Sequence, residues 1–419
     1  MEQNNSDSSS LKGRKLILRA FRYRNYRLFF TGQGISLIGT WMQRIAMSWL
    51  IYRLTGSPFL LGLVGFTGQI PTLIIAPYAG VIADRLNRLR IIIITQILSM
   101  LQALALSILV LTHTIQIWHI ILLSIFLGIV SAFDIPTRQS FIVEMVEDKK
   151  DLGNAIALNS FMFNSARLIG PSVGGILIAA VGDGICFLLN AISYIAVIIA
   201  LFAMRVKPRQ KSVLKKRTWH ELKEGAAYAF GFRPIRNILL LLALISLVGM
   251  PYTILMPVFA KDILGGGPHT LGFLMAGVGF GALSGAIFLA PRKSAEGLER
   301  IIPIASVIFG IGLITFSLSR TFLASLILIA VSGFGMMVQN ASCNTLIQTI
   351  VDDDKRGRVM SFYSMAFMGT APFGSLIAGS LASRIGAPNT LILGGIACIL
   401  GAIAFTRQLP KMHSKLNQT

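Results

Sequence analysis

Charged residues are scarce in this chain. Only 13% of its 419 residues are Asp, Glu, Lys or Arg, whereas 54% are hydrophobic and the mean hydropathy is +0.71. A soluble protein keeps about a quarter of its residues charged. There is too little charge here to coat a water-soluble surface, so lipid must cover much of the molecule.

Groups that carry enzyme chemistry are also few. The three cysteines, Cys186, Cys343 and Cys398, lie in apolar stretches without paired or metal-like spacing, and we interpret them as small core residues. No Gly-Lys pair occurs, which excludes a P-loop and hence ATP as the direct energy source. The five histidines are scattered, with no His-Glu-x-x-His and no Ser/His/Asp grouping. We therefore predict that the protein is not an enzyme and holds no cofactor or metal.

Long apolar stretches are abundant in this chain. Twelve stretches are each long enough, at about 20 residues, to cross a bilayer as a helix. We place these spans at residues 28–52, 58–82, 91–112, 116–137, 154–180, 184–204, 237–260, 270–290, 301–319, 322–345, 359–382 and 387–406. They use most of the chain and predict an all-α integral membrane protein with twelve transmembrane helices.

The basic residues lie mainly on one side of these spans. With twelve crossings both termini share a side, and 32 of the 38 Lys and Arg residues fall there. The positive-inside rule then places both termini in the cytoplasm, with the protein in the inner or plasma membrane. The formal net charge of +21 is therefore a topology signal, and no nucleic-acid partner is expected. The N-terminal tail is basic but lacks the apolar core of a signal peptide.

One long polar break divides the spans into two sets of six. It contains Thr218-x-x-Glu221, a capping box that predicts an amphipathic helix on the cytoplasmic surface. An unstructured linker fits residues 207–217 equally well. The expected organisation is a basic cytoplasmic tail (1–27), a six-helix bundle (28–204), a cytoplasmic linker (205–236), a second six-helix bundle (237–406) and a cytoplasmic C-terminal tail (407–419).

The two sets of spans resemble each other. Residues 56–62 and 266–272 share Gly, Pro, Leu and Gly at one constant offset. The glycines at 153, 170, 175 and 182 likewise match those at 357, 374, 379 and 386. We interpret the matches as an ancient duplication, although chance matches among 40 glycines are an alternative. Two pseudo-symmetric six-helix bundles are the architecture of a rocker transporter with its site between the halves.

The loop after the second span carries a motif. It reads Gly80-Val-Ile-Ala-Asp-Arg-Leu-Asn-Arg-Leu-Arg90. It resembles the loop signature of the major facilitator superfamily, Gly-x-Leu-Ala-Asp-Arg-x-Gly-Arg-Arg/Lys, with three departures. The resemblance implies the major facilitator fold and a latch that closes the cytoplasmic side in the outward-facing state. The latch would comprise Gly80, Asp84, Arg85 and Arg88, with Asp134 and Arg138 as partners. A plain positive-inside turn would explain the arginines but not Asp84.

A second motif lies in the fifth span, which reads Gly170-Pro171-Ser-Val-Gly174-Gly175. It resembles the Gly-Pro-x-x-Gly-Gly core of the superfamily's antiporter motif, which is found mainly in exporters. Small residues let helices approach and proline bends a span, so a generic packing interface would carry the same residues.

Further segments narrow the branch of the superfamily. Residues 133–139, 152–155, 169–171 and 187–194 together look like the subgroup that holds the enterobactin-type siderophore exporters and related macrolide efflux proteins. The resemblance covers nearly all of the chain. It leaves the substrate open because that branch is chemically diverse.

Polar residues within the spans are the candidates for binding substrate, because they are expensive in lipid. A centred arginine that faces lipid costs at least about 2.5–3.5 kcal/mol, so we expect Arg44 and Arg167 to face a cavity between the halves. Bridging of backbone carbonyls is the alternative for both. Trp41, on the same span as Arg44, is expected to point elsewhere. The cavity candidates are Gln33, Thr40, Gln43, Arg44, Asn164, Arg167, Asn190, Tyr194, Gln339, Asn340, Asn344, Tyr363 and Met368. For the Asn and Gln residues, hydrogen bonds between helices are an equally good interpretation.

No acidic residue is expected in the middle of a span. Asp84 and Asp134 are the deepest, each about one turn from the cytoplasmic end. Two cations without a carboxylate at that depth favour an anionic or electron-rich substrate. The family resemblance implies coupling to the proton gradient, for which Asp134 is the expected titrating group, because burial near Arg88 would tune it.

The resulting hypothesis is a secondary transporter in the lipid bilayer. It would be a monomeric, proton-coupled exporter of a small siderophore-like or drug-like molecule, working by alternating access. The alternatives are an importer or a lipid flippase on the same scaffold, a non-transporting sensor or assembly partner, and a membrane-embedded enzyme.

Overall fold

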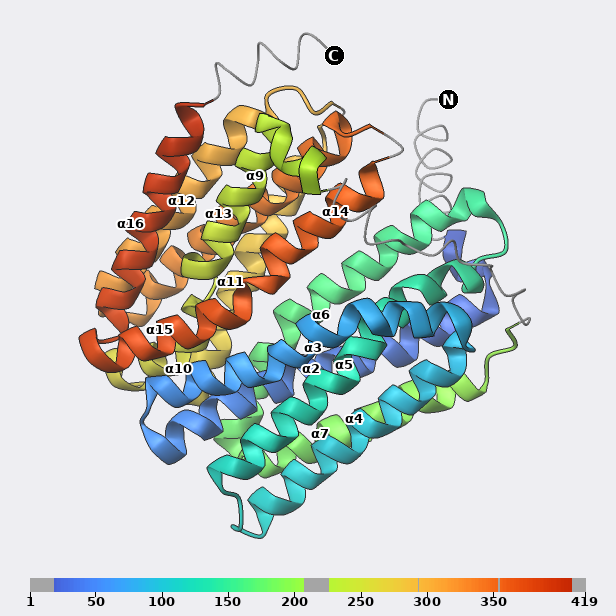
Figure 1. Ribbon diagram of the computed structural model, residues 1–419. Coiled ribbons are helices and arrows are strands. Elements are labelled where there is room, and N and C mark those ends of the chain that lie inside the picture. The colour runs from blue at the N-terminus through green and yellow to red at the C-terminus, as the bar shows by residue number, and fades with distance from the viewer. Residues whose placement is uncertain (1–18, 207–225, 293, 353–354, 409–419) are drawn as a thin grey trace, which may run out of the picture.

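The protein is built from long helices. The computed structural model describes residues 19–206, 226–292, 294–352 and 355–408, and this part of the chain contains no strand (Figure 1). A short 3-10 turn, η1 (Arg19–Arg22), precedes the first span.

Six uninterrupted helices form the N-terminal half. They are α2 (Arg24–Thr55), α3 (Pro58–Arg85), α4 (Arg88–Leu111), α5 (Ile117–Met145), α6 (Leu152–Val181) and α7 (Asp183–Phe202). Residues suited to helix ends separate them. Gly56 ends α2 in a left-handed conformation with φ of 59°. The Ser57 and Asn87 side chains then accept hydrogen bonds from the first turns of α3 and α4.

Two spans of the C-terminal half are interrupted by π-helical turns. The seventh consists of α9 (Arg233–Leu244), η3 (Ile245–Gly249), α10 (Tyr252–Val258) and η4 (Phe259–Ile263), and the eleventh of α14 (Arg356–Ser364), η5 (Met365–Gly369) and α15 (Ala371–Ile385). The uninterrupted helices are α11 (Pro268–Leu289), α12 (Leu298–Leu318), α13 (Phe322–Ile350) and α16 (Ala387–Thr406). The Ser246 hydroxyl donates to the Phe367 carbonyl, which ties the two interruptions together.

Eleven helical stretches in the described part are long and apolar enough to cross a membrane. The helix α2 is the twelfth. Its 32 residues are ample for a hydrocarbon layer of about 30 Å, but it carries four arginines, which lower its hydropathy. The predicted all-α membrane fold with twelve helices is confirmed.

Several helices extend beyond the predicted spans. The fourth span was predicted to end at residue 137, but α5 continues to Met145. It can do so because Arg138 and Glu144, beyond the apolar stretch, both form ion pairs. Asp134 therefore lies about three helical turns from the end of α5, and the expectation of one turn is wrong.

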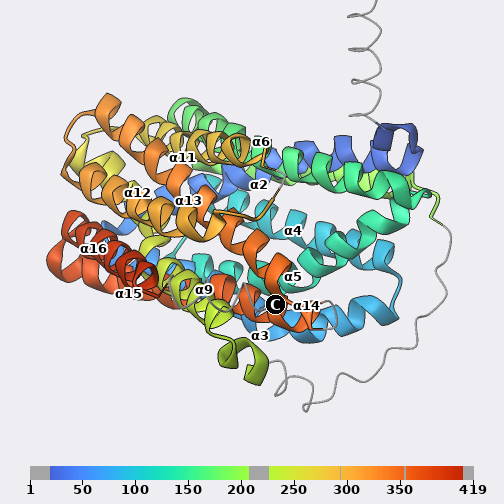
Figure 2. The same cartoon turned by 90° about the horizontal axis from the view of Figure 1, so that it is seen from above.

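The two sets of six spans form two bundles that meet at one end and diverge toward the other (Figures 1 and 2). We term the meeting end, which holds the α2–α3 and α6–α7 turns, the far end. The opposite end holds the first and last described residues and is termed the terminus end.

Glycine pairs join the bundles toward the far end. A Cβ at Gly175 of α6 would lie 2.9 Å from the Cα of Gly272 of α11, and a Cβ at Gly62 of α3 would lie 2.9 Å from the Cα of Gly379 of α15. Such backbone contact is possible only without side chains. Gly62 matches Gly272 in sequence, and Gly175 matches Gly379. Each contact therefore joins the first matched block of one half to the second matched block of the other.

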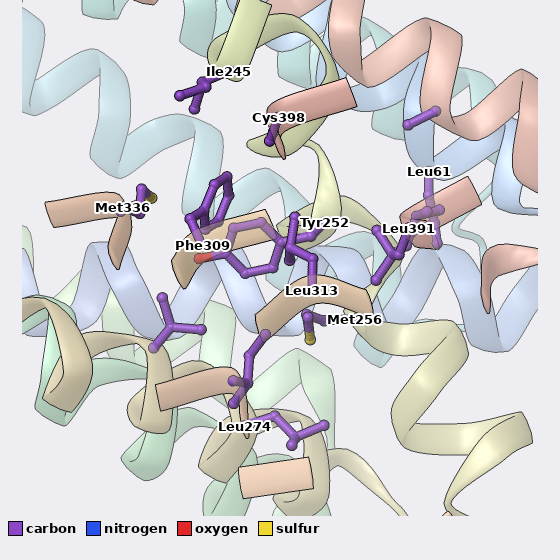
Figure 3. Close-up of a cluster of buried hydrophobic side chains, with 14 of the residues drawn as sticks. Leu61, Ile245, Tyr252, Met256, Leu274, Phe309, Leu313, Met336, Leu391 and Cys398 are labelled. Carbon is purple, nitrogen blue, oxygen red and sulfur yellow. The ribbon is translucent and has the colours of Figure 1, made fainter. Parts of the chain in front are cut away.

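The hydrophobic core is shared between the halves toward the far end. In Figure 3, Tyr252 of α10 packs edge-on against Phe309, with ring centroids 6.0 Å apart, and Leu61 of α3 belongs to the same cluster. A second cluster around Tyr26 and Phe141 contains only residues of the first half and η1 and its flanks. All three cysteines are buried and free, which confirms them as core residues.

Most of the predicted linker helix, including the Thr218–Glu221 capping box, lies outside the described residues, as do most of both tails. Residues 226–231 are helical and lead into α9. The Tyr228 hydroxyl donates to the Asp352 carboxylate at 3.2 Å, and Lys355 Nζ donates to it at 3.0 Å. These bonds, with that from Lys355 the larger cause, lower the pKa of Asp352 below its usual range.

Candidate functional site

Arg44 lies in the middle of α2. At about 1.5 Å per residue it is about 16 Å from Thr55 along the helix, which is about half the thickness of a hydrocarbon core. Its side chain is exposed even though α2 packs against both α6 and α7. The guanidinium carbon lies 4.5 Å from the centroid of the Trp41 ring. Within the described part of the chain, Arg44 forms no hydrogen bond and no ion pair.

Arg167 of α6 approaches the same ring. Its guanidinium carbon lies 5.9 Å from the Trp41 centroid, and it too forms no hydrogen bond or ion pair among the described residues. Glycine permits the approach, because a Cβ at Gly170 would lie 2.5 Å from the Trp41 Cβ. The expectation that Trp41 points away from Arg44 is wrong. Residues three apart on a helix share a face, and packing against α6 turns that face toward both arginines.

A third arginine lies within electrostatic range of Arg44. Both Arg138 of α5 and Arg167 interact with the charge of Arg44. Arg138 is itself paired, with Nη2 3.0 Å from the Asp134 carboxylate. This region therefore holds three guanidinium groups and one carboxylate. The alternative in which Arg44 and Arg167 bridge backbone carbonyls is not seen in the described residues.

Asp134 is buried and well bonded. Its carboxylate accepts from Thr95 Oγ1 at 3.0 Å and from Gln96 Nε2 at 2.8 Å, in addition to Arg138. The expected proximity to Arg88 is wrong. Arg88 instead bonds Glu144 of α5 at 2.9 Å, a carboxylate that the sequence analysis did not single out. The Arg88–Glu144 pair lies near the terminus end of the first half, whereas the Asp134–Arg138 pair lies deeper in it.

The other latch residues are only partly described. A Cβ at Gly80 would meet nothing within 4 Å, and Arg85 is exposed. The side chain of Asp84 lies outside the described part. The latch across the terminus end stays a prediction, because the bundles diverge there in this conformation (Figure 1).

Several predicted cavity residues instead bond helices together. Asn190 Nδ2 donates to Gln43 Oε1 at 2.6 Å, and Gln43 Nε2 donates to Gln102 Oε1 at 2.9 Å. All three side chains are buried, so they link α7, α2 and α4. For Gln43 and Asn190 the interhelical interpretation is right and the cavity interpretation wrong. Gln33 is only 2% exposed and likewise does not line a cavity.

Gln43→Leu should therefore affect stability rather than binding. It removes the donor to Gln102 Oε1 and the acceptor of Asn190 Nδ2. An unsatisfied buried polar group in a soluble protein costs about 1–3 kcal/mol, whereas hydrogen bonds between membrane helices average about 0.6 kcal/mol. We expect a loss of about 1 kcal/mol in thermal unfolding of the purified protein, with substrate affinity retained. Gln69→Leu, at an exposed position bonded only to its own helix, is the control. An equal loss in both variants would contradict the network.

Two other candidates of the first half lie near Arg44. The Thr40 and Tyr194 hydroxyls are 3.4 Å apart, and Tyr194 interacts electrostatically with Arg44. Tyr194 is buried, whereas Thr40 is half-buried. Asn164 is half-buried and donates to the Ser160 carbonyl of its own helix.

The candidates of the second half are dispersed over α13, α14 and η5. Gln339 is 1% exposed and bonds Cys343 of its own helix, so its assignment to a cavity is wrong. Tyr363 is buried and donates to Asn340 across α13 and α14. Asn344 accepts from Gln348, and Met368 is exposed on η5.

The glycines of the antiporter-like motif are packing residues. Gly170 and Gly174 lie against α2, where a Cβ at Gly174 would be 3.0 Å from the Met42 Cγ. Gly175 and the Pro171 carbonyl lie against Gly272 of α11. The packing interpretation thus describes this motif here, and a role in antiport stays a prediction.

A polar contact joins the halves at the far end. The Tyr52 hydroxyl of α2 donates to the Asp262 carboxylate of η4, and Lys261 Nζ lies 5.5 Å from the centroid of the Tyr52 ring. Beside it, Arg53 Nη2 lies 2.5 Å from the Asp183 carboxylate of α7. The sequence analysis singled out neither acid, and the partners of both are distant in the chain.

The sequence matches the transmembrane secretion effector family over residues 17–419. The chain belongs to this family. It is 26% identical to the staphyloferrin A transporter of Staphylococcus aureus, over 94% of this chain and 98% of that protein. It is 24% identical to the multidrug efflux pump Tap of Mycolicibacterium fortuitum (89% and 91% covered) and 22% to macrolide efflux protein A of Streptococcus pyogenes (94% and 100%). These relatives confirm the resemblance to the siderophore and macrolide efflux branch of the major facilitator superfamily.

Solved structures show the same fold for this chain. A bacterial homologue of the human lysosomal transporter Spinster, in an inward-facing and unoccupied conformation, aligns with a TM-score of 0.73 at 16% identity, over 91% of this chain and 96% of that one. A bacterial homologue of ferroportin in an inward-facing state aligns with a TM-score of 0.71 at 16% identity, over 92% and 98%. The protein is an integral membrane transporter of the major facilitator fold.

Proposed function

We propose that this transporter is a proton-coupled exporter of a small siderophore-like or drug-like molecule, working by alternating access. Its relatives include a staphyloferrin A transporter and two kinds of efflux protein. The observation that carries the proposal is Arg44, a charged side chain at mid-membrane depth that is exposed and has no hydrogen bond or ion pair among the described residues. Charged residues within spans mark substrate pathways.

The terminus end would face the cytoplasm of the inner or plasma membrane, because 32 of the 38 basic residues lie on that side. In that orientation the glycine pairs and the Tyr52–Asp262 bond close the outer side, and substrate reaches Arg44 from the cytoplasm. Export would then break the far-end contacts while Asp84, Arg85 and Arg88 close the terminus end. One chain supplies both bundles and the site, which supports a monomer.

Asp134 is the proposed proton site. Its carboxylate forms an ion pair with Arg138 and accepts hydrogen bonds from Thr95 and Gln96. Protonation would remove the charge that pairs Arg138, and Arg138 lies within electrostatic range of Arg44. Titration of one acid would in this way change the charge beside the substrate.

The direct test uses everted membrane vesicles, in which an exporter moves solute inward. We expect the wild type to accumulate radiolabelled staphyloferrin A, the solute that one of its relatives is named for, when a proton gradient is imposed. Asp134→Asn should fold normally but lose at least tenfold of the gradient-dependent rate, because its side chain no longer titrates. Glu147→Gln, at an exposed acid near the terminus end, is the matched control and should transport normally.

Other results of the same experiment would support one of the alternative functions. Unchanged coupling in Asp134→Asn removes Asp134 from the mechanism. Solute movement out of the everted vesicles indicates an importer, and movement of labelled lipid alone indicates a flippase. A protein that moves no solute under any gradient would fit a sensor or an assembly partner, which would also tolerate Arg44→Ala together with Arg167→Ala.

A further inference from the structure

The charges of Arg44 and Arg167 are not neutralised by their described neighbours. Each guanidinium group contacts the Trp41 ring, and neither forms an ion pair among the described residues. An aromatic ring attracts a cation through its quadrupole but carries no net charge. Two like charges beside one ring in a membrane-spanning region would therefore be stabilised by an anion that the protein itself does not supply.

The charge of the region indicates how many negative charges that anion carries. Two charged groups, Arg167 and Arg138, lie within electrostatic range of Arg44, and Arg138 is paired with Asp134. With Asp134 ionised, one carboxylate offsets one of three guanidinium charges, and two remain. Arg88 adds nothing to this excess because Glu144 pairs with it. A ligand with two negative charges would balance the site.

The geometry restricts the shape of the ligand. A guanidinium group presents a planar fork that matches a carboxylate with two parallel hydrogen bonds. Because both forks lie beside the same indole, the two carboxylates must belong to one small molecule. The Trp41 ring, with the Phe163 ring edge-on at 5.8 Å, offers an apolar face to the carbon skeleton between them. The Gly170 contact that brings α6 against α2 sets the distance between the two arms.

We propose that Trp41, Arg44 and Arg167 form a binding site for a small organic anion with at least two carboxylates. Each arginine binds one carboxylate, and the indole covers the skeleton that joins them. This proposal rests on the proposed function, because it names the substrate class of the same central site.

Binding can be measured without transport. Purified protein in lipid nanodiscs is titrated at pH 7 and constant ionic strength with citrate, and separately with propionate, by calorimetry and by indole fluorescence. We expect citrate to bind at least tenfold more tightly than propionate and to change the Trp41 emission. This contrast needs no variant. Equal affinities, or no citrate binding at 10 mM, would overturn the proposal.

The variants test the assignment to residues. Arg44→Gln and Arg167→Gln should each weaken citrate binding at least tenfold, and Arg→Lys at either site should recover part of it, since lysine keeps the charge but not the fork. Trp41→Phe should lose the fluorescence change and weaken citrate binding less than either Gln variant does, since phenylalanine keeps an aromatic face of smaller area. Arg384→Gln, at an exposed arginine near the far end, is the control and should bind as the wild type does. Unchanged affinity in both Gln variants would place any citrate site elsewhere and refute the assignment.

Failure of this proposal differs from failure of the proposed function. If vesicles export staphyloferrin A under a gradient while citrate does not bind, the proposed export function is supported and the dicarboxylate site is refuted. If citrate binds in an arginine-dependent way but no solute is exported, the site stands and the exporter falls.

Discussion

Gly272→Val is expected to abolish transport by holding the far end open. A Cβ at this position would lie 2.5 Å from the Pro171 carbonyl oxygen and 2.9 Å from the Gly175 Cα. Both are backbone atoms, which cannot rotate away as a side chain can, so the two methyl groups of valine must separate α6 from α11. The same crossing joins the bundles in this conformation. Gly379→Val should act alike at the pseudo-symmetric contact, where a Cβ would lie 2.7 Å from the Pro58 carbonyl oxygen.

Two measurements check this result. The vesicle transport rate should fall more than tenfold. In addition, a cysteine at Ser48, between Arg44 and the far end of α2, should become reactive toward an impermeant maleimide added from the far side. The native cysteines are buried, so the introduced one dominates the signal. The control is Gly153→Val on α6, where a Cβ would meet nothing within 4 Å. If the Gly272→Val protein transported normally and the cysteine at Ser48 remained unreactive in it, the contact between α6 and α11 would not close the far end.

Tyr52→Phe is expected to shift the protein toward a conformation open at the far end. The substitution removes the hydroxyl that donates to Asp262, and with it a charge-assisted hydrogen bond between the halves. Bonds to charged groups contribute about 1.5–3 kcal/mol, and the exposed position of Asp262 argues for the lower value. Since 1.4 kcal/mol is a factor of ten, the population of the open conformation should rise about tenfold.

Spin-label distances report that population. Labels at Thr114 and Thr321, exposed positions in far-end turns of opposite halves, should show a larger fraction of long distances in Tyr52→Phe than in the wild type. Asp262→Asn should shift the distribution in the same direction. Tyr78→Phe, at a tyrosine that is 71% exposed on α3, is the control. If both test variants had the distance distribution of the wild type, the Tyr52–Asp262 bond would not contribute to closing the far end.

The features that the sequence predicted well are those set by local composition. An apolar run of about 20 residues forms a helix in lipid because every backbone polar group must be bonded within the segment. This requirement holds for each span separately, so the spans could be found one at a time. The glycine blocks were also visible locally, but their match was interpreted only as a duplication, and the contacts that they make between the bundles were not predicted.

The partners of individual polar side chains were predicted poorly. Gln43 and Asn190 were candidates for the cavity, yet they bond each other across 147 residues of chain. Asp134 was assigned to Arg88, whereas its ion pair is with Arg138, four residues further along α5. The spacing of residues along one helix shows which of them share a face, but not which neighbouring helix that face meets.

The amino-acid sequence by itself determined that this protein is a membrane-embedded helical transporter, because lipid imposes helical spans and the motifs around residues 80–90 and 170–175 resemble those of the major facilitator superfamily. Only the tertiary structure decided which polar residues are exposed between the spans and which are locked in the packing. The physical reason is that burial and pairing depend on contacts between helices far apart in the chain. Gly170 allows one such contact, and through it Arg44, Trp41 and Arg167 come together.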